Sequence, residues 1–233
     1  MKNYIKDREL ENSGTQARIS NEVRILKAKY YEKEPFDIQV DIDRVFEEVA
    51  KIIPSPFLDY IDTIIVGQFD FLDQRDLDAL YSDASIYLSN KDKEVESDIV
   101  DDIVHEIAHA VEENNQHIIY SDNMISAEFL SKRNNLYFLL KENGFNEEVD
   151  FYDFDNLEYD EQFDMFLYQE VSYPLLDTLT TNIFCSPYGA TSLREYFANC
   201  FEHYFYSSTP KLVKAVSPRV HDKIQELLNT HEN

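Results

Sequence analysis

The segment His105-Glu106-Ile107-Ala108-His109 places two imidazoles and a carboxylate within five residues. Residues four apart lie on one face of an α-helix, so both imidazoles can reach a single metal ion. Glu106 lies one step round the helix, where its carboxylate can take a proton from water bound to that metal. In a helix, this spacing predicts the zinc site of a hydrolytic enzyme. The alternative is a pair of surface histidines on an acidic helix.

A catalytic zinc ion takes three protein ligands and keeps one coordination position for water. The metzincin arrangement is excluded, because it requires glycine at position 112 and histidine at position 115, where this chain has Glu112 and Asn115. Glu195 supplies a carboxylate on a later segment instead, among Phe197, Ala198 and Phe201. An acidic group among aromatic side chains is unfavourable unless it is paired, and a zinc ion is an effective partner.

We therefore predict that His105, His109 and Glu195 bind one zinc ion per chain. Glu202 and His203 follow two turns later, and a solvated helix face explains them better.

The histidine motif needs a helix, and the sequence predicts one over residues 97–113. Ser97 is expected as its N-cap and Asp98 in its first turn. Apolar residues at helical spacing on both sides of the histidines would bury this helix. They are Ile99, Val100, Ile103, Val104, Ile107, Ala108 and Val111.

The remaining elements follow from hydrophobic periodicity and from the few Gly and Pro residues. We predict short strands at 63–67 and 85–89 and a loop in the acidic stretch 147–164. Further helices are predicted at 15–33, 40–52, 124–142, 161–183 (interrupted at Pro174), 191–207 and 211–229. The expected fold is α+β, a mainly helical zincin-like domain with a small mixed sheet before the motif helix. We expect a helical N-terminal region at 1–55, joined to a metallopeptidase domain at 56–233.

Composition limits the partners of the chain. Its 233 residues are 43% hydrophobic and 14% aromatic, which is enough for a packed core, and its formal net charge is −25. Such a surface repels phosphate backbones and anionic headgroups, so we expect neither nucleic acid nor membrane partners. Without an apolar segment near residues 1–10, a cytoplasmic location is expected. Cys185 and Cys200 are expected to be free thiols, although a bridge between them stays open.

The histidine motif together with Glu195-Tyr196-Phe197-Ala198 resembles the anthrax lethal factor-like and proline-proline endopeptidase family of zinc metallopeptidases, which are of the gluzincin type. In that family a catalytic tyrosine lies seven residues before the glutamate ligand, and that position here is Tyr188. The resemblance spans roughly residues 60–230 and has no counterpart for the first 50. Asp102 departs from it, since zincins commonly carry an uncharged residue there, and the stretch 147–164 has no family motif.

The resemblance implies a zinc-dependent metalloendopeptidase that hydrolyses peptide or protein substrates. Glu106 would activate the zinc-bound water, and zinc with Tyr188 would stabilise the oxyanion. One alternative is a catalytically silent zincin-like binding or structural component of a larger assembly, such as a phage particle. Another is a toxin delivered into a different cell. The sequence does not predict the oligomeric state.

Residues around the motif have expected supporting roles. Carboxylates that hydrogen-bond to the metal-binding histidines should orient their rings. The motif helix offers four such carboxylates, and none of them is favoured individually. They are Asp101, Asp102, Glu112 and Glu113. The strand at 85–89 is the expected sheet edge to which an extended peptide substrate would add.

Overall fold

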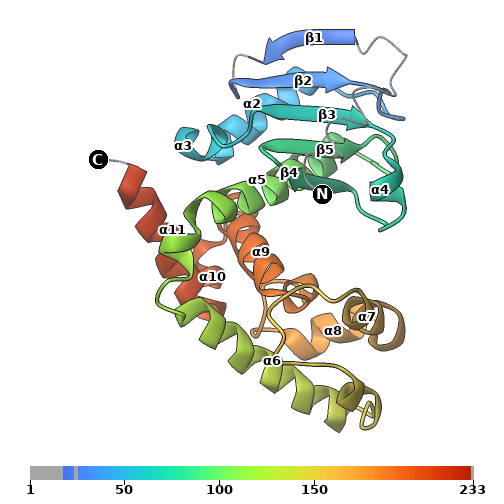
Figure 1. Ribbon diagram of the computed structural model, residues 1–233, viewed down its shortest axis with the longest axis vertical. Helices are drawn as coiled ribbons and strands as arrows, with labels where there is room; N and C mark the ends of the chain where they lie inside the picture. Colours follow the sequence, from blue (N-terminus) through green and yellow to red (C-terminus); the bar gives the residue numbers. More distant parts are fainter. Residues whose placement is uncertain (1–17, 24–25, 232–233) are drawn as a thin grey trace. The chain divides into compact units, whose positions relative to one another are not determined.

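The computed structural model describes residues 18–23 and 26–231 (Figure 1). Its contacts divide the chain into two compact units, residues 1–111 and 112–233. Most described residues are helical, and the strands form one small mixed sheet, so the α+β class is confirmed. The expected division into regions 1–55 and 56–233 stays a prediction. No helix among the described residues is both long and apolar enough to span a membrane.

A five-stranded sheet forms the first unit, with the strands in the order β1-β2-β3-β5-β4 (Figure 1). The strands are β1 (Arg18–Val23), β2 (Ala28–Glu32), β3 (Thr63–Gly67), β4 (Ala79–Ser82) and β5 (Ser85–Ser89). β2, β3 and β5 run parallel, whereas β1 and β4 pair antiparallel at the two edges. The predicted strands at 63–67 and 85–89 are confirmed. However, β5 pairs on both sides, so the expectation that it forms an edge is wrong, and β4 forms that edge.

The predicted helix at 15–33 is wrong where the structure describes it, because β1 and β2 occupy this region. In β2, Ala28 and Tyr30 are buried and Lys29 between them is exposed, which is the period of two typical of a strand. Pairing of residues 29–32 with β3 overrides the helical preference of this lysine-rich segment. Residues 15–17 and 24–25 of the prediction lie outside the described residues.

Helices of the first unit pack on this sheet. They are α2 (Ile42–Ile52), α3 (Ser55–Leu58), α4 (Asp70–Asp73) and the beginning of α5 (Glu96–Ile119). α2 confirms the prediction for 40–52: Asp41 caps it by accepting a hydrogen bond from the Arg44 N–H, and Phe46 is completely buried. The Phe46 ring packs edge-on against Tyr30 of β2, with 5.6 Å between the ring centroids. Apolar burial between helix and sheet therefore stabilises this unit.

Helices and two short 3-10 segments make up the second unit, beginning with the end of α5. They are α6 (Met124–Glu142), η1 (Glu148–Phe151), α7 (Glu161–Met165), the π-helical η2 (Phe166–Val171), α8 (Tyr173–Thr180), η3 (Pro187–Ala190), α9 (Leu193–Phe205), α10 (Pro210–Val216) and α11 (Pro218–His231). The helix at 124–142 is confirmed and ends at Asn143 and Gly144, where Gly144 has a φ of +103°.

Two predicted helices are each divided. The 161–183 helix breaks at Ser172, whose φ is +74°, and Pro174 stands in the first turn of the new helix, α8. The 211–229 helix breaks at Ser217, and Pro218 begins α11. The predicted loop 147–164 contains η1 and the start of α7. In both divided helices a proline lies at the start of the second helix instead of bending a continuous one.

Buried Arg133 on α6 anchors the acidic stretch 147–164. Its guanidinium donates to the carbonyl oxygens of Asp153 at 3.1 Å and Ala190 at 3.2 Å. It also lies over the Phe163 ring, 4.1 Å from the centroid. One cation thereby satisfies carbonyls from two loops and joins the acidic stretch to the segment that leads into α9.

Replacing Ile86 with alanine should destabilise the protein, because this β5 side chain is completely buried in the sheet core. The expected loss in free energy of unfolding is about 2–5 kcal/mol. Val95→Ala is the matched control: Val95 is 53% exposed, so its loss should stay within about 0.5 kcal/mol. Urea unfolding followed by circular dichroism measures both. Equal midpoints for the two variants would contradict this account of the core.

Candidate metal centre

Helix α5 carries the two predicted histidine ligands. The rings of His105 and His109 lie at an interplanar angle of 80°, with centroids 5.0 Å apart. The helix begins at Glu96, so the prediction of Ser97 as N-cap is wrong by two positions. Asp98 does lie in the first turn, where its carboxylate accepts from the backbone N–H of Glu94. All the apolar residues expected to flank the motif are buried, so packing fixes the rotation of the helix and the direction of both rings.

Helix α9 carries the third predicted ligand in its first turn. Ser192 is the N-cap, and its hydroxyl accepts a hydrogen bond from the Glu195 N–H at 3.2 Å. A carboxylate in the first turn is favoured by the positive end of the helix dipole. Tyr196 and Phe197, the next two residues, are completely buried, whereas Glu195 is partly exposed. Packing of these two rings therefore holds the first turn of α9, which carries the Glu195 carboxylate, in place. The spacing Ser-x-x-Glu is a helix-start signal that was already visible in the sequence.

His105, His109 and Glu195 offer one ligand atom each, and these atoms all lie within 4.8 Å of one another. Ligands in tetrahedral coordination about 2.1 Å from zinc lie about 3.4 Å apart. The 4.8 Å limit is wider than this spacing, so the donor set matches zinc in type and number. Glu202 and His203 are not part of this group. Metal binding itself stays a prediction.

An ion pair between a buried carboxylate and a half-exposed guanidinium connects the end of α5 to α9. Glu112 is 2% exposed, and its carboxylate accepts from the Arg194 guanidinium at 2.8 Å and from the Tyr120 hydroxyl at 3.0 Å. All three residues belong to the second unit. Glu112 lies one turn after His109 on the same helix, and Arg194 directly precedes Glu195. Of the four carboxylates considered as orienting groups, Glu112 therefore has the position to fix the ligand helices, whereas Glu113 is exposed.

Glu106, the predicted proton acceptor, is 5% exposed. Its Oε2 accepts a hydrogen bond of 2.5 Å from the backbone N–H of Tyr81 on edge strand β4. A carboxylate has two oxygens, so this bond orients the group while Oε1 can serve a second proton donor. Neither β4 nor this contact was predicted from the sequence, although Ala79 and Tyr81 alternate with two more exposed residues in the pattern of a strand.

Tyr188 lies in η3, a short 3-10 segment immediately before α9. Burial raises the pKa of its hydroxyl well above the ordinary value, and the negative charge of Glu195 adds to this effect. The hydroxyl therefore stays protonated near neutral pH and can donate a hydrogen bond. Thr191 holds the segment, because its hydroxyl donates to the Tyr188 carbonyl at 2.8 Å. The structure thus brings Tyr188 close enough to Glu195 for their charges to interact.

Asp102, which departs from the family pattern, forms an ion pair with Lys93 at 2.6 Å. The Lys93 side chain is 3% exposed and also contacts Asp78 at 2.7 Å. Burial raises the pKa of Asp102 to about 6, while the charge of Lys93 opposes this rise. A lysine twelve positions before the motif therefore compensates the unusual acidic residue, which explains how the helix accepts it.

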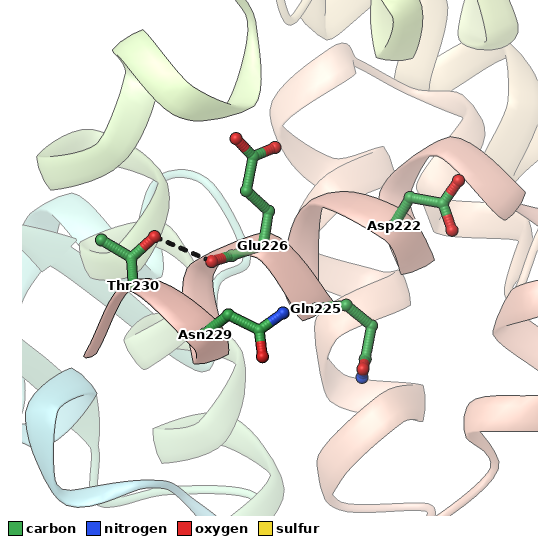
Figure 2. A pocket seen from close by; sticks show the side chains of 5 residues that line it. All are labelled: Asp222, Gln225, Glu226, Asn229 and Thr230. Atoms are coloured by element: carbon green, nitrogen blue, oxygen red, sulfur yellow. Dashed lines mark hydrogen bonds between the residues drawn. The ribbon is translucent and has the colours of Figure 1, made fainter. Parts of the chain in front are cut away.

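A surface hollow lies along α11 of the second unit (Figure 2). Its lining residues are Asp222, Gln225, Glu226, Asn229 and Thr230, and the Thr230 hydroxyl donates to the Glu226 carbonyl within the helix. None of the predicted metal-binding or catalytic residues lines this hollow. It is an open face of one helix and supports no site.

Comparisons with protein families, with curated proteins and with solved structures gave no significant match. The resemblance to lethal factor-like peptidases therefore stays a prediction. The function of the site has to be argued from its own geometry.

Replacing Glu112 with glutamine should weaken zinc binding, because Arg194 loses its charged partner and the α5–α9 contact loosens. A change in such a supporting group lowers metal affinity about 10–100-fold. Glu113→Gln is the matched control, since it removes the same charge from the exposed neighbour. Competition against a chromophoric chelator measures zinc affinity, and circular dichroism establishes that both variants fold. A folded Glu112→Gln protein with unchanged zinc affinity would refute the positioning role.

Asp102 should make the metal-free protein less stable as pH rises from about 4 to 6. Its pKa is about 6 in the folded protein and about 3.8 in the unfolded chain, so the folded state binds more protons in this range. The effect amounts to about 2–3 kcal/mol lost by pH 7. Urea unfolding at several pH values, with a chelator present, tests this by comparing the protein with Asp102→Asn. The difference between their stabilities should change across pH 4–6; a constant difference would contradict the raised pKa.

Proposed function

We propose that this protein is a zinc-dependent metalloendopeptidase. His105, His109 and Glu195 hold the zinc ion, and Glu106 and Tyr188 serve the reaction. The observation that carries the proposal is the convergence of two imidazoles and one carboxylate, all within 4.8 Å, with the buried carboxylate of Glu106 adjacent in the helix. Three protein ligands of this kind with a fourth position for water are typical of catalytic zinc rather than structural zinc.

The protein residues divide the chemistry among themselves. Zinc supplies Lewis acidity and lowers the pKa of water to about 7. The Glu106 carboxylate, oriented by the Tyr81 N–H, takes the proton of the attacking water and passes it to the leaving nitrogen. The protonated Tyr188 hydroxyl donates a hydrogen bond to the developing oxyanion. Peptide hydrolysis needs these roles, and the chain has a residue for each.

Edge strand β4 is the proposed docking strand for the substrate. Among the strands that the structure describes, it pairs with β5 alone, so an extended peptide could add to its other side through main-chain hydrogen bonds. Tyr81 of this strand also holds Glu106. The strand that would bind the peptide is therefore the same strand that orients Glu106, the proposed proton acceptor.

One observation favours the alternative of a catalytically silent binding or structural protein. The 2.5 Å bond from the Tyr81 N–H occupies one oxygen of Glu106, which is an arrangement that could serve the fold alone. The two functions differ in peptide cleavage, whereas both allow zinc binding.

Glu106→Gln should keep zinc and the fold but lose peptide cleavage, since an amide cannot accept the proton of water. The expected fall in kcat/KM is about 10²–10⁴-fold. Glu113→Gln, an exposed carboxylate on the same helix, is the control and should cleave normally. Metal analysis and cleavage of a peptide library measure both properties, and a chelator should abolish cleavage until zinc is restored.

Two outcomes would contradict the peptidase. Zinc-loaded protein that cleaves no library member would favour the binding or structural function. Cleavage that persists in Glu106→Gln or in the presence of chelator would place the chemistry elsewhere.

A further inference from the structure

Two thiols meet in the second unit, outside the proposed metal ligands. Cys185 Sγ and Cys200 Sγ are 3.5 Å apart, and both cysteines are free. Cys200 is completely buried in α9, whereas Cys185, just before η3, is partly exposed. The sulfurs must approach by about 1.5 Å to reach a disulfide bond length of about 2.05 Å. Small side-chain rotations can supply that movement.

A buried lysine lies beside this pair. Lys132 of α6 is 8% exposed, and its ammonium donates to the carbonyls of Ile183 and Val216 and to the Ser217 hydroxyl. None of these three acceptors carries a formal charge. Burial lowers the pKa of this ammonium, and the negative charge of Glu128 opposes that effect. A thiolate at Cys185 or Cys200 would add a second negative charge beside it.

The two sulfurs have different environments. The hydrogen bond with Cys200 lowers the pKa of Cys185, and the charge of Lys132 acts in the same direction. Burial raises the pKa of Cys200 well above its usual range. The accessible sulfur is therefore the one that ionises first. This is the arrangement of an attacking thiol, Cys185, and a resolving thiol, Cys200.

We propose that Cys185 and Cys200 form a redox-active dithiol that a low-molecular-weight disulfide oxidises to an intramolecular disulfide, with Lys132 as the counter-cation of the attacking sulfur. The Cys185 thiolate attacks one sulfur of the small disulfide, whose S–S bond breaks and releases a small thiol carrying the proton that Cys185 lost. Cys200 then loses its proton and attacks the sulfur of Cys185, and a second small thiol leaves with that proton. Two cysteines are oxidised while one small disulfide is reduced to two thiols.

The new bond would close a ring around residues 186–199, which include Tyr188 and Glu195. The Ser186 hydroxyl already donates to the Asn199 side chain beside the thiols, so the two ends of this segment are held together before oxidation. Closing a loop of this size should raise the Tm by about 6–12 °C. The proposal does not rest on the proposed peptidase activity.

Equilibration of the full-length protein with glutathione and glutathione disulfide at varied ratios tests the proposal. Remaining thiols are blocked with iodoacetamide, and mass spectrometry then locates the modified cysteines. Both thiols should disappear together, with one crosslinked peptide pair formed. Cys200→Ser should stop at a glutathione adduct on Cys185, whereas Cys185→Ser should stay unreactive because Cys200 is buried. Lys132→Met should slow the first step about tenfold, because the thiolate fraction falls.

Alkylation of both cysteines at every glutathione ratio would overturn the proposal. So would accumulation, in the wild-type protein, of a Cys185 adduct with Cys200 still free. Unchanged kinetics in folded Lys132→Met would remove the role of the lysine. Redox titration of the wild type and the two serine variants carries the test even where Lys132→Met does not fold. Because the readout is mass, it neither requires nor reports zinc binding or peptide cleavage.

Discussion

The pairing of Glu112 with Arg194 is the interaction on which the proposed metal centre depends. It joins a buried carboxylate on α5 to a guanidinium at the start of α9, and the Tyr120 hydroxyl completes the arrangement. Removing Arg194 would leave the buried Glu112 carboxylate without its counter-charge, which is destabilising. Glu112 lies one helical turn after His109, and Arg194 directly precedes Glu195. The contact joins the end of α5 to the beginning of α9 within the second unit.

Buried cations recur in this acidic chain, and each has a different solution. Lys93 is neutralised by carboxylates, and Arg133 donates to backbone carbonyls and lies over aromatic rings. Lys132 donates to neutral oxygens and lies over the Tyr196 ring. With 46 acidic and 21 basic residues, most acids of the chain need no basic partner and can stay in water. The basic residues that are buried therefore mark places where the fold has to hold loops together, and two of the three lie on α6.

Local signals in the sequence were sufficient for the parts of the structure that depend on local physics. The strand at 63–67 and the helix at 124–142 were predicted with their observed bounds, because apolar residues and an Asn-Gly ending define them. The helix prediction was wrong at β2, because long-range pairing with β3 decides the conformation there. The two ligand histidines followed from helix geometry, and Glu195 from its aromatic surroundings. Arg194, Tyr81 and Lys93 could not be predicted, since their roles depend on partners 82, 25 and 9 residues away.

The segment from Cys185 to Cys200 is held in place by contacts along its length. It contains Tyr188, Arg194 and Glu195, and three kinds of contact hold it: the thiols at its ends, the Ser186–Asn199 hydrogen bond and the Arg133 bond to Ala190. A segment with so many attachments loses little conformational entropy when a ligand binds, because the folded chain has already lost it. The affinity of the proposed metal site would therefore depend on how firmly this segment is attached as well as on the donor atoms. Contacts that touch no metal can thus determine whether the histidines and the glutamate act as one site.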